Sequence, residues 1–246
     1  MTAVLFIHGF PFDHFLWRHQ VAALSRWRCI APDLPGAGTS RGFDSPDEYS
    51  MSRYATYLVG ILDQLKLREA VICGLSMGGY IAFELLRRFP ERVRAAILCN
   101  TKAAADTPDV KRGRDAVAAK AQKEGAHAVA ADLVPQLIAR ATRDRQPEVV
   151  REVTEMIERQ PVSGIVGALR ALRERPDSTP LLAAIRVPVL VVAGDDDQIA
   201  PAAGMQEMAR SIPGARFALV PNAGHVAPLE QPITVSSALA DFLAKL

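Results

Sequence analysis

A serine framed by two glycines lies in the first third of the chain. The segment Gly74-Leu75-Ser76-Met77-Gly78 follows the apolar run Ala70–Cys73 and leads into a helical pattern from Tyr80 to Phe89. A serine raised on a tight turn between a strand and a helix takes a strained backbone conformation, and the residues two before and two after it pack so closely that glycine fits best. We therefore predict that Ser76 is a nucleophile, the alternative being a glycine-rich turn with an exposed serine.

A serine hydroxyl is a weak nucleophile at neutral pH, so a base must lie elsewhere in the chain. His225 ends the turn-rich segment Pro221–His225, which follows a strand-like run near the C-terminus. His14 and His19 belong to an aromatic-rich stretch, and His127 lies in an alanine-rich helical stretch, so we interpret these three as structural. The sequence therefore predicts His225 as the general base.

The acid that orients this histidine should follow a strand and precede the histidine in the chain. Three consecutive carboxylates, Asp195, Asp196 and Asp197, follow the apolar run Val189–Ala193. We choose Asp197 because it is followed at Pro201 by a break, in the pattern G-x-x-D-x-x-x-P. The other two are the alternatives, as solvated loop residues or helix caps. The acid would hold the tautomer of the histidine and stabilise the imidazolium without taking the proton.

Attack on a carbonyl group also needs two donors for the negative oxygen that forms. The backbone N–H of Met77 follows the nucleophile and supplies one of them. We expect the second from the N–H of Phe10 in the segment His8-Gly9-Phe10-Pro11, where the glycine lets the chain turn after the first apolar run. A simple turn at the end of a strand is the alternative for this segment.

Several buried strands with helices between them must bring these residues together. The long crossover helix predicted over 49–65 has apolar residues at spacings of three and four, as one buried face requires. Short apolar runs that end in Gly or Asp are typical of a buried parallel sheet. The clearest predicted strands are Val4–Ile7, Arg28–Ala31, Ala70–Cys73, Arg94–Cys99, Val189–Ala193 and Arg216–Val220.

Strand-like runs are absent between residues 102 and 180. Ala, Arg, Glu and Gln dominate there, and breaks divide the segment into about four predicted helices. We therefore predict a core formed by residues 1–101 and 181–246, with residues 102–180 as a helical cap. An insertion between two parallel strands would lie over the strand ends and cover the ligand crevice. The alternative is a helical subdomain that never touches substrate.

The composition narrows the classes of partner. The 246 residues carry 29 Lys plus Arg against 27 Asp plus Glu, and because the signs are interspersed we expect no nucleic acid partner. Cys29, Cys73 and Cys99 lie in strand-like stretches without metal-ligand spacing, so we expect buried free thiols and no metal. The chain opens without a positive region before its apolar residues, and no apolar run reaches the ~18 residues of a membrane span. The sequence therefore predicts a cytoplasmic protein without membrane contact.

Five motifs together resemble the α/β-hydrolase superfamily over essentially the whole chain. They are HGFP at 8–11, PDLPGAGTS at 32–40, GLSMGG at 74–79, GDDDQIAP at 194–201 and AGH at 223–225. Within the superfamily, residues 101–103, 106–108 and 168–177 are similar to small bacterial carboxylesterases and 3-oxoadipate enol-lactonases. The resemblance implies a catalytic triad and an oxyanion hole formed by the residues already chosen: Ser76, Asp197 and His225, with Phe10 and Met77. It gives Asp33 a structural place, in the turn after the second strand.

The start of the chain departs from the superfamily pattern. Members commonly begin with an antiparallel hairpin, whereas this chain opens directly on Thr2-Ala3-Val4-Leu5. We therefore expect an α/β-hydrolase fold with about six strands, all parallel, flanked by helices and carrying the cap. The sheet edge near the N-terminus would be exposed unless covered, so both a monomer and a homodimer remain open.

Hydrolysis of a small-molecule carboxylic ester or lactone is the predicted function, with neither a metal nor an organic cofactor. An aspartate at position 76 would have indicated a dehalogenase or an epoxide hydrolase. A cofactor-free perhydrolase or haloperoxidase resembles this chain in its HGFP and SMGG segments. Hydroxynitrile lyases resemble one another in a lysine just after the catalytic histidine, where this chain has Val226. The non-enzyme alternative is a hydrolase-fold binding protein with a vestigial site.

The composition of the predicted cap indicates what kind of substrate the pocket would accept. It is rich in Ala, Leu, Ile and Val, which favours an apolar pocket for a small or medium acyl group. Its arginines are interpreted as a solvated helix face, with recognition of an acidic substrate as the alternative. These arginines include Arg140, Arg143, Arg145, Arg170 and Arg173.

Overall fold

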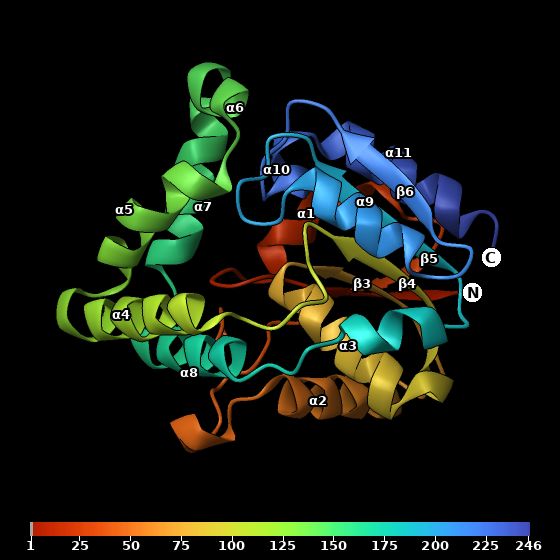
Figure 1. Ribbon diagram of the computed structural model, residues 1–246, viewed down its shortest axis with the longest axis horizontal. Helices are drawn as coiled ribbons and strands as arrows, with labels where there is room; N and C mark the ends of the chain where they lie inside the picture. Colours follow the sequence, from red (N-terminus) through yellow and green to blue (C-terminus); the bar gives the residue numbers. More distant parts are fainter. Residues whose placement is uncertain (1) are drawn as a thin grey trace.

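Six parallel strands form the sheet at the centre of the molecule (Figure 1). The structure is a computed structural model and describes residues 2–246. The strands lie in the order β2-β1-β3-β4-β5-β6, and every neighbouring pair is parallel, as the sequence predicts. Their bounds are β1 Ala3–Ile7, β2 Arg28–Ile30, β3 Ala70–Leu75, β4 Val93–Cys99, β5 Val189–Gly194 and β6 Arg216–Val220.

Helices cover both faces of this sheet, because parallel strands joined by helical crossovers are buried on both sides. Strands β1, β3 and β5 are buried along their whole length. On one face α1 packs with α10 and α11, and on the other α2 packs with α3 (Figure 1). The helices of the core are α1 Arg18–Ala23, α2 Met51–Gln64, α3 Met77–Arg88, α9 Ala202–Arg210, α10 Ala227–Glu230 and α11 Pro232–Leu243. Short 3-10 helices are η1 His14–Trp17, η2 Pro46–Glu48, η3 Pro90–Arg92 and η4 Thr179–Ala184.

The crossover helix α2 shows how the local sequence sets an element. It begins one residue after Ser50, whose side chain accepts a hydrogen bond from the N–H of Arg53, as an N-cap does. Its buried residues recur at spacings of three and four, which confirms the predicted amphipathic helix with slightly shorter ends. This face packs against α3, the helix that follows Ser76.

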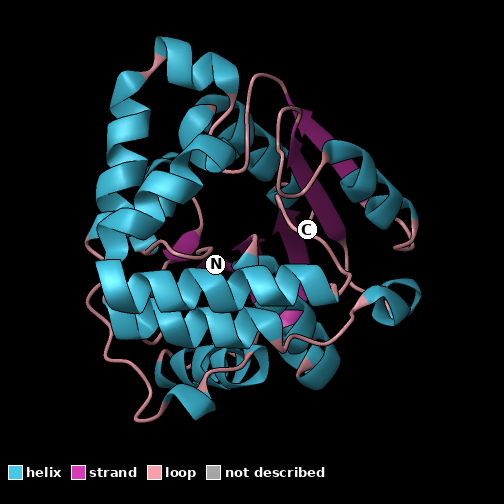
Figure 2. Cartoon of the chain, turned by 60° about the vertical axis from the view of Figure 1, so that its left-hand side comes forward, coloured by secondary structure: helices cyan, strands magenta, loops and turns pink. Residues whose placement is uncertain are grey.

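A helical insertion lies between β4 and β5. It contains five helices rather than the predicted four, namely α4 Pro108–Glu124, α5 Ala126–Leu137, α6 Arg140–Arg145, α7 Pro147–Glu158 and α8 Val162–Arg173. The missed break is at Ile138 and Ala139, where the backbone is extended although neither residue is Gly or Pro, while Pro135 lies inside α5. Helices α4 and α8 run side by side, as do α5 and α7 (Figure 2).

The first strand of the chain, β1, is not an edge strand, because it lies between β2 and β3. The edge strand on that side of the sheet is β2. Strand β2 has only three residues and exposes Arg28, and short charged edges resist pairing with another chain. Cys73 and Cys99 are buried free thiols as predicted, but Cys29 on this edge strand is only half-buried. No helix among residues 2–246 combines the length and the apolar character needed to cross a membrane.

Candidate active site

Ser76 occupies a sharp turn between β3 and α3. Its φ of 53° and ψ of −111° lie where residues with a side chain are rarely found, which is the strain expected of a serine raised at the end of a strand. The N–H of Ser76 donates to the carbonyl of Cys99 at 2.9 Å, and its own carbonyl accepts from the N–H of Gly79 at 2.9 Å. These bonds hold the serine rigidly, with its side chain half-buried.

The two flanking glycines are required by backbone packing. A Cβ on Gly74 would lie 2.2 Å from the carbonyl oxygen of Gly78. A Cβ on Gly78 would lie 2.2 Å from the carbonyl oxygen of Ile7, in β1. Both contacts are with backbone atoms that cannot move aside, so the G-x-S-x-G pattern follows from the turn itself.

A buried histidine and a buried aspartate form a pair at the same end of the sheet. His225 follows β6 and Asp197 follows β5, and their side chains meet with Nδ1 at 2.8 Å from Oδ2 and 3.0 Å from Oδ1. An ionised carboxylate only accepts hydrogen bonds, so Nδ1 carries a proton, and in the neutral imidazole Nε2 is the acceptor. Within residues 2–246 the imidazole bonds to no protein group other than Asp197.

Asp197 is held in its ionised form. Burial alone raises the pKa of this carboxyl, but the imidazole of His225 and hydrogen bonds from Ala200 N–H and the Asn100 amide outweigh it, so the pKa lies below its ordinary value. Oδ1 accepts from the N–H groups of Ile199 at 2.8 Å and Ala200 at 2.9 Å. The carboxylate is therefore fixed in orientation as well as in charge.

The two preceding carboxylates point to other partners. Asp195 accepts a hydrogen bond from the N–H of Ala223 at 3.2 Å. Asp196 accepts from the N–H of Arg140 at 2.9 Å, at the start of α6. Neither forms a hydrogen bond to His225 in the described chain, so of the three only Asp197 meets the histidine.

Asn100 belongs to this site and was not predicted. It directly follows β4 with a φ of 45°, and its side-chain amide donates to Asp197 Oδ2 at 2.9 Å and to the carbonyl of Gly224 at 3.0 Å. It therefore ties the aspartate to the loop that carries His225. A polar residue directly after a buried strand was the available signal, because parallel strands end at the same edge of the sheet.

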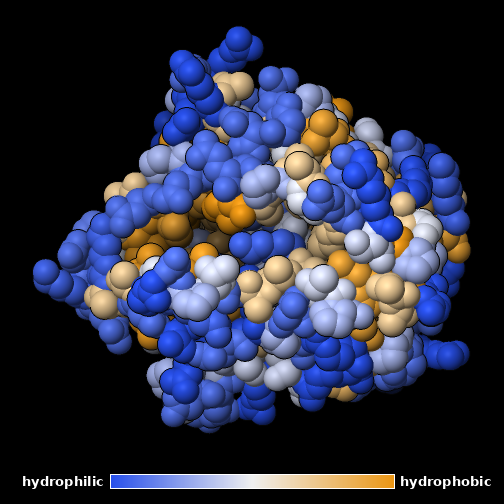
Figure 3. All heavy atoms as spheres, viewed as in Figure 1, coloured by the Kyte–Doolittle hydropathy of each residue, from blue (hydrophilic) through white to orange (hydrophobic). Residues whose placement is uncertain are grey.

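Ser76 and His225 line one cavity of about 50 Å³, together with Phe10. This volume admits only a few water molecules. The remaining lining comes mainly from apolar residues, four of the six from the insertion, and the whole set is Tyr80, Arg114, Leu133, Leu137, Leu172 and Ile199. In Figure 3 the surface is hollowed where the inserted helices meet the core, with apolar side chains inside the hollow.

The predicted oxyanion donors stand beside the serine. Met77 is the first residue of α3, and Phe10 follows β1 and lines the cavity. In the part of the chain that the structure describes, neither N–H donates to another protein atom. Both N–H groups therefore lack a protein acceptor among the described residues, and the N-terminus of α3 adds its positive dipole end beside Ser76.

The other histidines lie outside this arrangement. His8 is buried, and burial lowers its pKa; its Nδ1 donates to the carbonyl of Gly9 at 2.9 Å and its Nε2 accepts from the N–H of Leu34 at 3.0 Å. It thus ties the loop after β1 to the loop after β2. His19 on α1 is half-buried, His127 on α5 is exposed, and neither lines the cavity.

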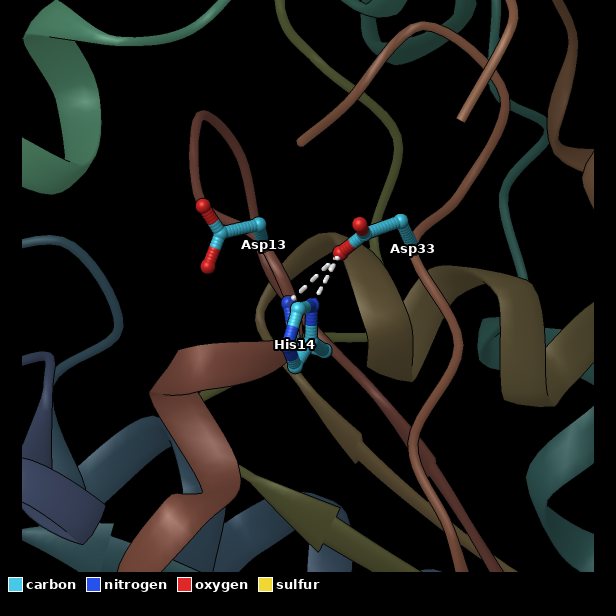
Figure 4. A group of neighbouring side chains, drawn as sticks. All are labelled: Asp13, His14 and Asp33. Atoms are coloured by element: carbon cyan, nitrogen blue, oxygen red, sulfur yellow. Dashed lines mark hydrogen bonds and ion pairs between the residues drawn. The ribbon is translucent and has the colours of Figure 1, made fainter. Parts of the chain in front are cut away.

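A second group of titratable side chains lies between these two loops (Figure 4). Asp13, His14 and Asp33 bring ligand atoms within 4.8 Å of one another. Both carboxylates already have protein donors, since Asp33 accepts from His14 Nδ1 at 2.7 Å and Asp13 accepts from Arg159 at 2.8 and 2.9 Å and from Gln160 at 3.0 Å. These bonds join the loops to the end of α7, which agrees with structural roles for His14 and Asp33.

One insertion arginine lines the cavity, and it is not among the five arginines considered from the sequence. Arg114 on α4 pairs through Nε with Asp106 Oδ2 at 3.2 Å. Asp106 also pairs with buried Arg175 at 2.6 Å, so two guanidinium groups share one carboxylate and leave a net positive charge. The five arginines considered from the sequence line no part of this cavity: Arg140, Arg143, Arg145, Arg170 and Arg173.

A wholly parallel sheet with a strained serine between strand and helix, and an aspartate–histidine pair after later strands, defines the hydrolase class of α/β protein. The chain belongs to the α/β hydrolase fold family, whose model matches residues 2–232.

A thermophilic esterase from Thermogutta terrifontis, solved with malate bound, is 38% identical, with a TM-score of 0.97 over 100% of this chain and 90% of that one. The enol-lactonase from Burkholderia xenovorans LB400 is 31% identical, with a TM-score of 0.91 over 99% of this chain and 91% of that one. The 3-oxoadipate enol-lactonase 2 of Acinetobacter baylyi is 27% identical over 94% of this chain and 84% of its own length. The protein is thus an α/β hydrolase related to esterases and enol-lactonases.

Proposed function

We propose that this protein hydrolyses a carboxylic ester or lactone through an acyl-enzyme on Ser76. The observation that carries the proposal is that His225, held by a buried hydrogen bond to Asp197, lines the same cavity as Ser76. A neutral imidazole with a free Nε2 beside a serine hydroxyl is the pair that nucleophilic acyl transfer needs. The relationship to an esterase and to enol-lactonases supports the same chemistry.

The reaction would proceed in two balanced halves. Ser76 Oγ forms a bond to the substrate carbonyl carbon while His225 Nε2 takes the hydroxyl proton, and the N–H groups of Phe10 and Met77 receive the oxyanion. As the intermediate collapses, His225 returns the proton to the leaving alkoxide oxygen. Water then attacks the acyl-enzyme by the same route, with its proton passing through His225 to Ser76. Asp197 holds the imidazole and stabilises its charged form throughout.

Residues 102–180 would act as a cap in this reaction. Four of the side chains that line the cavity come from the insertion, and three of these are leucines: Leu133, Leu137 and Leu172. An apolar lining that excludes water from the reacting carbonyl strengthens each electrostatic contact inside the site. The small volume and the apolar wall favour a short acyl group.

The small cavity predicts a steep dependence of kcat/KM on the length of the acyl chain. Against p-nitrophenyl esters of graded length, kcat/KM should be highest for two to four acyl carbons and fall by about tenfold or more at eight, because each poorly accommodated methylene costs on the order of 1 kcal/mol. The same panel should include several lactones and a peroxide arm, in which acyl transfer to peroxide is compared with transfer to water. Absence of all ester and lactone hydrolysis, together with no labelling of Ser76 by a fluorophosphonate, would contradict the proposed function.

The cationic lining residue further suggests an acyl group with a carboxylate. In the described chain, Arg114 makes its only side-chain hydrogen bond through Nε, to Asp106, which leaves its two terminal nitrogens for a substrate anion. A paired carboxylate and guanidinium recognise each other through charge-assisted hydrogen bonds. The malate bound by the related esterase is itself a dicarboxylic acid.

Replacing Arg114 tests this selectivity. In Arg114→Leu the KM for the mono-p-nitrophenyl ester of succinate should rise by about tenfold, the loss of one charged hydrogen bond, while KM for the butyrate ester stays within about twofold. Arg114→Lys keeps the charge beside Asp106 and should recover part of the binding. Arg140→Leu, on the exposed surface of α6, is the matched control and should change neither substrate. Equal effects on both esters in Arg114→Leu would refute anion recognition.

A further inference from the structure

A buried glutamate joins the insertion to the loop that carries His225. Glu230 ends the short helix α10 and is 1% exposed. Its Oε1 accepts the N–H of Gly224 at 2.8 Å, and its Oε2 accepts the N–H of Ala139 at 2.8 Å. Gly224 directly precedes His225, and Ala139 lies in the extended break between α5 and α6. One carboxylate therefore bridges two segments that are far apart in the chain.

A second set of contacts ties the same two segments together. The carbonyl of Leu137 accepts the N–H of His225 at 2.8 Å and that of Val226 at 3.3 Å. A Cβ on Gly224 would lie 2.6 Å from the nitrogen of Ala139, so the two backbones touch without an intervening side chain. The side chain of Leu137 lines the cavity beside Ser76. Leu137 thus lines the cavity with its side chain and holds the backbone of His225 with its carbonyl group.

The carboxylate is suited to a fixed bridge. Burial raises the pKa of Glu230 above its ordinary value, although the N–H of Ala139, the Thr142 hydroxyl and the N–H of Gly224 favour the ionised form. A buried acceptor without donors is costly, and the donors lose their partner if it is removed. The bridge is therefore a satisfied buried contact between insertion and core, rather than a solvated surface pair.

We propose that Glu230 is a positioning residue that fixes His225 relative to the insertion. Its two hydrogen bonds keep the break at residues 137–139 and the loop at 224–226 at a fixed distance from each other. A substrate that displaces Leu137 would therefore also displace the imidazole of His225. The consequence for turnover rests on the proposed function, whereas the mechanical link does not. Glu230 itself does not line the cavity.

Two substitutions remove the link from opposite sides. Glu230→Gln keeps the side-chain shape but can accept at only one oxygen, so its amide nitrogen faces one of the two N–H groups. Ala139→Pro deletes the N–H donated from the insertion and puts the ring carbon Cδ in its place, so it also displaces the Glu230 carboxylate oxygen that lies 2.8 Å from that nitrogen. The backbone there suits proline, with φ −56° and ψ 149° at Ala139 and the extended values φ −113° and ψ 132° at Ile138 before it.

We expect kcat to fall about 10- to 100-fold in each variant, with KM within about twofold, because a displacement of roughly 1 Å in a reacting group has effects of that size. The double variant should fall no further than about threefold beyond the worse single one, because both changes break the same bridge. Glu84→Gln is the matched control: Glu84 is also buried, pairs with Arg87, and makes no hydrogen bond to the His225 loop in the described chain. It should lower the melting temperature and leave kcat unchanged.

Amide hydrogen exchange tests the contact between the two segments independently of enzymatic activity. Ala139→Pro should lose amide protection at residues 224–226, and Glu230→Gln at residues 137–139, each on the side away from the substitution. Unchanged exchange across the bridge in a folded variant, or a lower melting temperature with kcat unchanged in both variants, would overturn the proposal. If the wild-type protein has no ester or lactone activity, the proposed function fails, and exchange alone then decides whether the link exists. If Glu230→Gln does not fold, Ala139→Pro and its exchange pattern carry the test.

Discussion

Ser76→Ala is expected to lower ester turnover by a factor on the order of 10⁴ or more while the fold is retained. Alanine removes the only atom that would bond to the substrate carbonyl, and what remains is binding and the two backbone donors. Alanine keeps the Cβ already present at φ 53°, so it adds no new backbone strain. Turnover of p-nitrophenyl butyrate and the melting temperature by circular dichroism measure the two effects separately.

A second serine supplies the control for this substitution. Ser211 follows α9, is exposed, and bonds through its hydroxyl to the carbonyl of Glu207. Ser211→Ala should leave turnover within about twofold, since it lies outside the proposed machinery. A Ser76→Ala protein that retained more than a tenth of wild-type turnover would remove Ser76 from the mechanism.

Asp197→Asn is expected to cost about 10⁴-fold in kcat, the largest effect apart from that of the nucleophile. Asparagine would keep its oxygen on the N–H groups of Ile199 and Ala200 and turn its amide nitrogen toward His225. The imidazole would then accept at Nδ1 and carry its proton on Nε2, which cannot take a proton from Ser76. The loss therefore arises mainly from the wrong tautomer, and the Asn100 amide also loses its acceptor at Oδ2.

The neighbouring carboxylate separates this effect from a general change in charge. Asp195 bonds to the N–H of Ala223 and not to His225, so Asp195→Asn should keep kcat within a few-fold of wild type. Both variants should be assayed between pH 6 and 9. In Asp197→Asn the neutral imidazole keeps its proton on Nε2 throughout this range, so raising the pH should not restore kcat. A larger loss in Asp195→Asn than in Asp197→Asn would reverse the assignment of the acid.

Local features of the sequence were enough to predict the strands, the turn at Ser76 and the crossover helix. Each depends on residues close together in the chain: apolar runs that must be buried on both faces, a serine between glycines, and spacings of three and four. Helix breaks were predicted where Gly or Pro marked them. The break at Ile138 and Ala139 was missed because the tertiary contacts of Ala139 with Glu230, and not a breaker residue, hold that backbone extended.

By itself, then, the sequence determined the class of fold and proposed a serine, a histidine and one of three adjacent carboxylates. Only the tertiary structure decided that Asp197 is the carboxylate that meets His225. It also added Arg114 and Glu230, which no local pattern marks, and Asn100, whose one local signal was its place directly after a buried strand. It also put β2 at the sheet edge and β1 inside. The physical reason is separation along the chain: Asn100 meets Asp197 across 97 positions and Ala139 meets Glu230 across 91, and contacts of that range have no periodicity from which to predict them.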